Sequence, residues 1–254
     1  MKCINNNRQG YVPRFGWCRD SMLKSWSEGI YGEGIAADGD EWCAVRSADF
    51  LFLSGEPADT AELAEYINNS MGKYATVIPE HSGWLEPLCN AGARIKKMTR
   101  YHTRLPEGGF DRELLERFAA YDAECVSILK AGKNEYELLK NCDWENCFVS
   151  NFKDREDFFE HGLGYVCIIG GELASAATTF GYYSGGYEIQ LATAPKFRRR
   201  GLAAAVSAAF LLECLDRGKT PHWDAANMTS VRIAQRLGFV FDGEYEAFDK
   251  VPEP

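Results

Sequence analysis

The sequence lacks any long hydrophobic run. No apolar stretch approaches the roughly 20 residues that a membrane-spanning helix needs, and the opening residues Met1–Asn7 lack the apolar core of a secretory signal. These absences argue against a membrane partner and against secretion. We therefore expect a cytoplasmic protein.

The cysteines lack the pattern of a disulfide framework or a metal site. There are nine, an odd number, and they are scattered along the chain. Cys142 and Cys147 lie close together, but without a second pair or a nearby group of histidines. Because a structural zinc ion takes about four ligands, we expect reduced thiols and no bound metal.

Basic charge is also scarce. The chain has 28 Lys and Arg against 37 Asp and Glu, which gives a formal net charge of -9. Nucleic-acid-binding surfaces are usually basic, so we expect no nucleic-acid partner. RNA binding through Arg94–Arg104 and Arg198–Arg200 is an alternative that the acidic net charge disfavours. The 46% hydrophobic and 26% charged fractions are typical of a folded globular protein.

The first half of the chain alternates predicted strands and helices. The patterns predict strands over Ser47–Ser54, Ala75–Pro79 and Arg94–Leu105, the last alternating apolar and basic residues as an exposed edge strand does. They predict helices over Thr60–Met71, Gly83–Ala91, Asp111–Leu129, Glu135–Leu139 and Asp154–Phe159. A turn over Leu105–Gly109 is a candidate boundary.

The second half shows sharper boundaries. Paired glycines at 170 and 171 predict a hairpin, and glycines at 218 and 238 predict helix ends. The predicted strands are Gly164–Ile169, Glu172–Tyr182, Tyr187–Thr193, His222–Asp224 and Phe239–Phe248, and the predicted helices are Arg199–Arg217 and Ser230–Leu237.

The order strand, helix, strand, helix, strand occurs twice, over about 47–105 and 187–248. One interpretation is a tandem of two related halves of which the first has lost its chemistry. The alternative is that α/β domains commonly show this order.

The strongest motif is Arg198-Arg199-Arg200-Gly201-Leu202-Ala203, between a predicted strand and a long helix. The first N–H groups of a helix lack internal partners, and the helix dipole makes that end positive. A pyrophosphate fits such an end, because Gly201 lets it approach the backbone and the arginines supply charged donors. Three cations at the positive end of a helix are electrostatically unfavourable unless an anion binds there. A solvated basic surface is the simpler alternative.

A second motif runs from Asn227 through Ser230 to Leu237-Gly238-Phe239. Together and in this order, the two motifs resemble the GNAT superfamily of acetyl-CoA-dependent N-acetyltransferases. The resemblance covers about residues 145–254. Within that superfamily the chain looks like a poorly characterised bacterial branch that carries an extra N-terminal domain.

The resemblance implies an α/β (α+β) fold with a mixed, mostly antiparallel twisted sheet flanked by helices. We expect this GNAT domain over residues 126–254 and a smaller α/β domain, without a CoA site, over residues 1–125. The resemblance also implies acetyl-CoA as co-substrate, with no metal. The implied cofactor-binding residues are Leu191, Ala192, Thr193, Arg198, Arg199, Arg200, Gly201, Leu202, Ala203, Asn227 and Ser230. Helix capping by Asn227 and Ser230 is the alternative for that pair, and both roles are compatible.

The resemblance further implies direct attack of an amine on the thioester, in a gap between Tyr187–Thr193 and the strand that contains Trp223. Glu188 is the first candidate for the general base and Asp224 the second. Many members donate a proton from a tyrosine whose position here is Ala234. Tyr245 or water is a candidate replacement.

The acceptor would be a small-molecule or peptide amine, and the oligomeric state is open. An alternative to the enzyme is a catalytically inactive acetyl-CoA-binding sensor or regulatory module, which the missing tyrosine favours.

Overall fold

The computed structural model describes residues 1–145 and 147–251. The chain forms two compact units: unit 1 contains Met1–Arg100 and Glu244–Pro254, and unit 2 contains Tyr101–Gly243. The boundary predicted after residue 125 falls inside unit 2. Across the part of the chain that is described, no helix is both long and apolar enough to cross a membrane.

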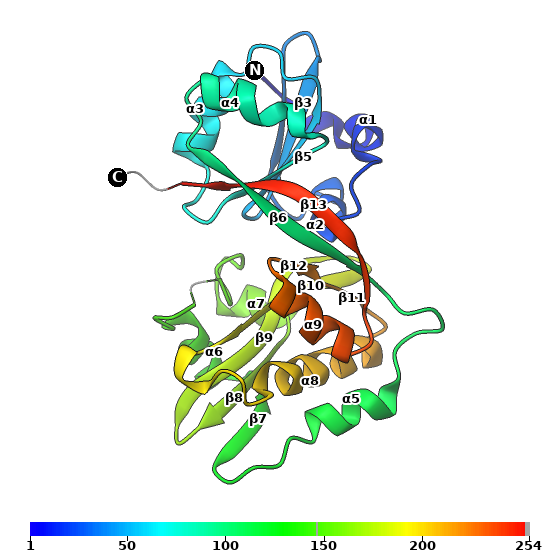
Figure 1. Ribbon diagram of the computed structural model, residues 1–254, viewed down its shortest axis with the longest axis vertical. Coiled ribbons are helices and arrows are strands. Elements are labelled where there is room, and N and C mark those ends of the chain that lie inside the picture. The colour runs from blue at the N-terminus through cyan, green and yellow to red at the C-terminus, as the bar shows by residue number, and fades with distance from the viewer. Residues whose placement is uncertain (146, 252–254) are drawn as a thin grey trace. The chain divides into compact units, whose positions relative to one another are not determined.

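Unit 1 begins with short helices and continues as a sheet with two helices packed on it (Figure 1). The strands are β1 (Lys2–Cys3), β2 (Glu33–Ala36), β3 (Trp42–Ser47), β4 (Phe50–Gly55), β5 (Thr76–Pro79) and most of β6 (Ile95–Arg104). The α-helices are α1 (Arg8–Tyr11), α2 (Ser21–Ser27), α3 (Ala61–Ser70) and α4 (Leu85–Asn90).

The core of unit 1 lies between this sheet and α3 and α4. Leu63 and Ile67 of α3 are fully buried, as the helical spacing of apolar residues predicts. Trp42 and Trp84 pack edge to face with ring centroids 6.4 Å apart. Phe248, from the far end of the chain, belongs to the same cluster.

Unit 2 contains a five-stranded sheet in the order β11-β10-β9-β8-β7. Its strands are β7 (Val126–Lys130), β8 (Gly164–Ile169), β9 (Glu172–Tyr183), β10 (Gly186–Thr193) and β11 (Thr220–His222), followed by the two-residue β12 (Asp224–Ala225). Its helices are α5 (Arg112–Ala119), α6 (Lys133–Lys140), α7 (Arg155–His161), α8 (Leu202–Asp216) and α9 (Met228–Arg236).

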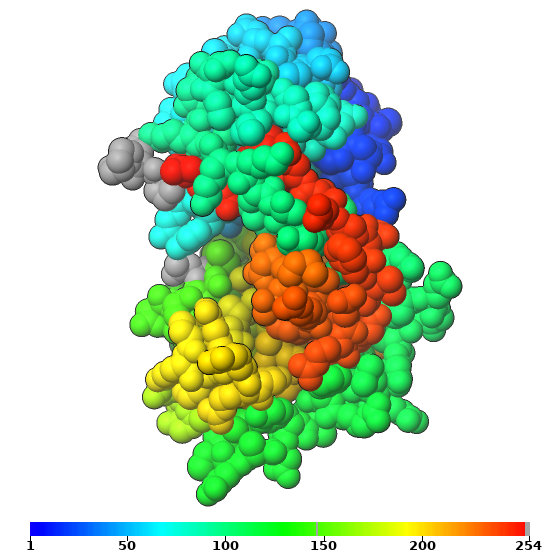
Figure 2. Space-filling view, viewed as in Figure 1, coloured from blue at the N-terminus to red at the C-terminus, as the bar shows by residue number. Residues whose placement is uncertain are grey.

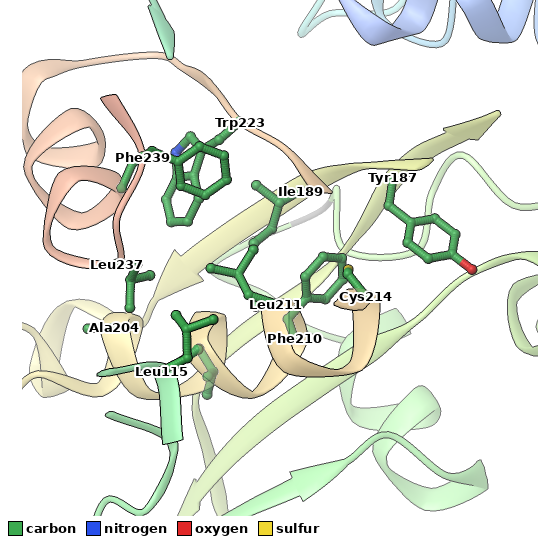
Figure 3. Close-up of a cluster of buried hydrophobic side chains, with 14 of the residues drawn as sticks. Leu115, Tyr187, Ile189, Ala204, Phe210, Leu211, Cys214, Trp223, Leu237 and Phe239 are labelled. Atoms are coloured by element: carbon green, nitrogen blue, oxygen red, sulfur yellow. The ribbon is translucent and has the colours of Figure 1, made fainter. Parts of the chain in front are cut away.

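Helix α8 forms the centre of unit 2. It is largely apolar because the sheet, α5 and α9 pack against it and bury ten of its fifteen residues. Figure 3 shows Trp223 against Phe239 in a hydrophobic cluster that also contains Leu115 of α5 and Leu211 of α8. The rings of Trp223 and Phe239 lie 5.6 Å apart between centroids. This rigid core positions both ends of α8.

The two units contain the same succession of elements. Three antiparallel strands, a helix, a parallel strand, a helix and a closing strand form β2–β6 in unit 1. The same succession recurs from β8 to β13 (Val240–Lys250). The predicted repetition of order is therefore confirmed, and it extends further toward the N-terminus of each half than expected.

The closing strands are exchanged between the two copies. Strand β13, which follows α9, pairs through Phe248 and Asp249 with β5 of unit 1. Strand β6, which follows α4, pairs through Tyr101 and His102 with β12 of unit 2. In the order β5-β13-β6-β12, β6 has neighbours on both sides, so the prediction of an edge strand over 94–105 is wrong.

Two predicted helices need correction. The helix expected over Asp111–Leu129 ends at Ala119, and strand β7 begins at Val126, where alternating Val126 and Ile128 favour a strand. Asp111 does cap α5, accepting a hydrogen bond from Leu114 N at 3.0 Å. The helix expected to start at Arg199 starts at Leu202, for a reason that lies in the site itself.

Candidate functional site

A cavity of about 450 Å³ in unit 2 lies between the end of β10, the start of α8 and one side of α9. Figure 2 shows the segment before α8 (yellow) beside α9 (orange) on the face toward the viewer. The lining residues are Leu191, Ala192, Thr193, Phe197, Arg198, Arg199, Arg200, Gly201, Leu202, Ala203, Ala204, Asn227, Thr229, Ser230, Ile233 and Arg236. All eleven residues predicted to contact the cofactor are among them.

The loop before α8 owes its shape to two left-handed residues. Arg199 has φ 62° and Gly201 has φ 83°. A residue with positive φ cannot continue a right-handed helix, which is why α8 begins only at Leu202. Left-handed backbone is unfavourable for arginine and is the kind of strain that functional sites hold.

The start of α8 offers uncapped donors to the cavity. The first bond within the helix runs from Ala205 N to Gly201 O at 3.2 Å, so the helix itself does not use the N–H groups of Leu202, Ala203 and Ala204. Gly201 has no side chain to cap them. A Cβ built on Gly201 would meet only the ring of Tyr121, at 3.6 Å, so the space beside this glycine is open.

The three consecutive arginines are exposed, and the loop is braced from two sides. Arg198 Nε donates to Thr193 O at 3.1 Å. Tyr121 Oη, from the segment after α5, donates to Arg200 O at 2.9 Å. The guanidinium of Arg200 lies 5.8 Å from the ring centroid of Phe197. The loop thus combines fixed backbone with positive side chains.

Strands β10 and β11 separate as they approach the cavity. They pair in parallel only as far as Glu188 and His222. Beyond this point the chain passes through Trp223 into β12, which pairs with β6 instead. The carboxylate Oε1 of Glu188 accepts from Asp224 N at 2.8 Å, in place of the next ladder bond. The pairing of these two strands therefore ends in the region where the gap is predicted.

The wall formed by β10 presents backbone groups to this gap. Ala194 N donates to Ala174 O at 2.9 Å, so the N–H groups of alternate residues point toward β9. By this alternation the N–H groups of Leu191 and Thr193 point away from β9, to the side where β11 has ended. The hydroxyl of Thr193 lies 2.8 Å from Ser175 Oγ.

The wall formed by α9 begins at its cap. Asn227 Oδ1 accepts from Ser230 N at 3.0 Å, so the predicted capping is confirmed. This bond uses the oxygen of the amide and leaves its nitrogen as a donor. Ser230 Oγ accepts from Trp223 Nε1 at 2.8 Å. Ala234, at the position of the missing tyrosine, has no exposed surface and faces the core.

None of the three predicted catalytic residues lines this cavity. Glu188 and Asp224 adjoin each other at the point where the strands separate, and Glu188 is only 4% exposed. Tyr245 is half-buried on β13, in unit 1. Their catalytic roles stay predictions.

Sequence reasoning missed five residues of the cavity wall: Phe197, Ala204, Thr229, Ile233 and Arg236. The signal for two of them was present, because Ser230, Ile233 and Arg236 follow one another at a spacing of three on α9. Residues at that spacing share one side of a helix. Among the described residues, no three His, Cys, Asp or Glu side chains are grouped so as to hold a metal ion.

Comparisons with known proteins agree with this fold. A GCN5-related N-acetyltransferase-like protein from Streptococcus suis 89/1591 has 29% identity and a TM-score of 0.86, over 97% of this chain and 99% of that chain. A GCN5-related N-acetyltransferase from Kribbella flavida has 13% identity and a TM-score of 0.57, over 99% and 97%, which shows similarity of fold alone.

Among curated proteins, the uncharacterized N-acetyltransferase YdfB of Bacillus subtilis (strain 168) is 29% identical over 93 residues. That match spans 36% of this chain and 36% of the relative. The family model for GNAT acetyltransferase matches residues 15–248, which is most of both units. The chain therefore belongs to the GNAT acetyltransferase family.

Proposed function

We propose that the protein transfers an acetyl group from acetyl-CoA to the nitrogen of an amine. The observation that carries this proposal is the cavity of unit 2, which extends from the uncapped start of α8 to Leu191–Thr193 of β10, beyond the point where β11 has ended. The start of α8 suits a pyrophosphate, and the backbone N–H groups beside the gap suit a thioester. A molecule that carries both groups, joined by a long arm, fits this arrangement.

The pyrophosphate of CoA would lie at the start of α8. The N–H groups of Leu202 and Ala203 and the positive end of the helix dipole favour an anion there. Gly201 keeps the approach open, and the neighbouring arginines supply charge-assisted bonds. The arm would extend along Asn227, whose amide nitrogen is a donor.

The thioester carbonyl would accept a hydrogen bond from Leu191 N or Thr193 N. Fixed donors of this kind stabilise the negative charge that develops on the oxygen when the amine attacks, usually among the larger catalytic terms. An alkylamine has a pKa of about 10.4 and must lose a proton before it attacks at neutral pH. Glu188 is the first candidate to accept that proton, directly or through water, and Asp224 the second.

The departing thiolate requires a proton, and Ala234 supplies none. Tyr245 or water would donate it. Since a thiol has a pKa of about 8.5, the thiolate is a good leaving group and water suffices. The alternative function, an acetyl-CoA-binding sensor without turnover, rests on the same observation that Ala234 is buried where a proton donor is expected.

We further propose that unit 1 does not bind CoA. Its strands β4 and β5 stay paired from Phe50–Thr76 to Leu53–Pro79, which leaves no gap between them. The end of β4 is already engaged by the chain itself, since Gly55 N and Ser54 Oγ both donate to Glu80 Oε2 at 2.9 Å. A Cβ built on Gly55 would lie 2.2 Å from Glu41 O.

A calorimetric titration with acetyl-CoA tests the proposal, using the wild type and Gly201→Glu. The substitution places bulk and negative charge where the pyrophosphate would lie, and we expect binding to become undetectable. Gly171→Glu is a matched control, because Gly171 has a similar φ of 86° with no atom within 4 Å of its built Cβ. It imposes the same backbone strain away from the cavity and should bind normally.

No binding by the wild type would overturn the proposal. Equal loss of binding in both glycine variants would show that strain, and not the cavity, is responsible. Binding without acyl transfer to a panel of small-molecule and peptide amines would favour the sensor.

A further inference from the structure

A fourth guanidinium group lines the cavity, apart from the three in the loop. Arg236 lies in the last turn of α9, on the side that carries Ser230 and Ile233. The helix dipole favours a cation in that turn, but the dipole does not determine which side of the helix the cation takes. Arg232, one turn earlier, is exposed and does not line the cavity.

The Arg236 side chain is held by an element outside the two sequence motifs. Its guanidinium lies 5.2 Å from the ring centroid of the half-buried Phe118 at the end of α5. Helix α5 is itself fixed, because Arg112 forms an ion pair with Asp216 of α8 at 2.8 Å. A guanidinium over an aromatic ring keeps its edge free for hydrogen bonds. The exposed guanidinium therefore has a packing partner that favours this position before any ligand binds.

The charges in the cavity exceed what a pyrophosphate needs. The loop arginines and the start of α8 already provide a complete site for its two phosphates. CoA carries a third phosphate, a monoester on the ribose 3′ position, and a phosphate monoester bears about -1.5 to -2 charges at pH 7. A separate cation on the opposite wall matches a separate phosphate.

We propose that Arg236, positioned by Phe118, binds the 3′-phosphate of CoA and makes the site selective for CoA over 3′-dephospho-CoA. The proposal rests on the proposed function, since it assumes that CoA occupies this cavity. Arg236 then distinguishes a ribose with a 3′-phosphate from one without it, whereas the loop before α8 binds the pyrophosphate that CoA and 3′-dephospho-CoA share.

The test is calorimetric binding of CoA and of 3′-dephospho-CoA to the wild type, Arg236→Gln and Arg232→Gln. We expect the wild type to prefer CoA by about tenfold, as one charge-assisted bond allows. Arg236→Gln should lose this preference while its affinity for 3′-dephospho-CoA stays unchanged. Arg232→Gln removes the same charge from the same helix and should keep the preference.

Equal affinity of the wild type for both ligands would overturn the proposal, and so would an Arg236→Gln variant that weakens both ligands equally. In either case the proposed function would stand, because CoA still binds. Failure of the wild type to bind either ligand would remove the proposed function and this proposal together.

The positioning role of Phe118 has its own readout. Phe118→Leu should reduce the ratio of the two affinities, and Phe118→Tyr, which keeps the aromatic ring, should restore it. A purely structural role would lower the melting temperature of Phe118→Leu and leave the ratio unchanged, which would contradict the assignment.

Discussion

Glu188 combines two possible tasks in one carboxylate. Its Oε1 accepts from Asp224 N where β10 and β11 separate, and the side chain is almost fully buried. A buried acceptor that replaces a ladder bond has a structural purpose without any catalysis. A carboxylate at the same point is also well placed to accept a proton.

The substitution Glu188→Gln separates these tasks. Glutamine keeps the carbonyl oxygen that Asp224 N requires, so the fold and acetyl-CoA affinity should stay unchanged. If Glu188 is the base, kcat/KM should fall by about 10² to 10⁴ and its dependence on pH should change shape. Steady-state rates across pH, with acetyl-CoA titration as the control, provide the measurement. An unchanged rate would transfer the role to Asp224 or to water.

At this scale the residues predicted from the sequence account for eleven of the cavity-lining residues, and five were missed. The loop and Asn227 lie in short contiguous motifs, so their positions could be predicted locally. Arg236 could not be assigned in this way, because its orientation depends on Phe118, which is more than a hundred residues earlier in the chain. Tyr245 was predicted from its place after the second motif, yet it lies in the part of β13 that belongs to unit 1.

At the scale of elements, the end of α8 is tied to the sheet by one carboxylate. Glu213 Oε1 accepts from Lys130 of β7 at 2.6 Å and from Arg217 at 2.9 Å. Glu213 Oε2 accepts from the hydroxyl of Tyr165 on β8 at 3.1 Å. Burial acts to raise the pKa of Glu213, but these hydrogen bonds outweigh it and hold the pKa below its usual value.

This network predicts a loss of stability in acid. A carboxyl whose pKa is lowered by folding stabilises the native state above its unfolded pKa of about 4.3, and this contribution is lost as pH falls through the folded value. Glu213→Gln should therefore lower the free energy of unfolding by about 1 kcal/mol at pH 7. Below the unfolded pKa the difference from the wild type should shrink.

Urea unfolding of the wild type and of Glu213→Gln measures the difference in their free energies of unfolding at pH 7 and at pH 3.5, about one unit below the unfolded pKa. Glu116→Gln is the control, since the Glu116 carboxylate pairs with Arg112 at 3.0 Å on an exposed surface and should matter little. A difference for Glu213→Gln that persists unchanged in acid would contradict the linkage.

The helices and strands were predicted correctly where the hydrophobic periodicity and the glycine turn signals agreed. The hairpin at Gly170 and the helix α9 were both predicted from the sequence to within two residues. The second half of Asp111–Leu129 was not, because its apolar residues fit a helical spacing and a strand equally well. Only pairing with β8 decides that Val126–Lys130 is a strand, and such pairing is a long-range contact.

At the scale of the whole chain, the last strand stabilises the first unit. Phe248 of β13 has no exposed surface and packs in the core of unit 1. Phe248→Ala should destabilise unit 1 by about 3–5 kcal/mol, the usual cost of removing a buried phenylalanine. Phe241→Ala, on the same strand but 39% exposed and within unit 2, should cost under about 1 kcal/mol.

Tryptophan fluorescence during urea unfolding measures this effect, because four of the six tryptophans, Trp17, Trp26, Trp42 and Trp84, belong to unit 1. Equal midpoints for the two phenylalanine variants would show that the Phe248 side chain contributes little to the stability of unit 1.

Exchange of the closing strands could not be predicted from the sequence. Each copy has its own closing strand at the expected place in the chain order. The local sequence does not determine which neighbouring strand the closing strand pairs with. The choice between β5 and β12 for β13 depends on pairing between residues about 170 positions apart, as for Phe248 and Val77. Local propensity carries no information about such partners.

The exchange of closing strands also delays the folding of unit 1 during translation. Unit 1 is complete only when Glu244–Lys250 has left the ribosome, after all of Tyr101–Gly243 has been made. At about 5–20 residues per second, that interval lasts roughly 7 to 29 s. Throughout this interval, β5 presents an unpaired edge that can pair with other nascent chains and so favours aggregation. Translation speed and chaperone supply should therefore govern the yield of this protein more than the intrinsic stability of either unit.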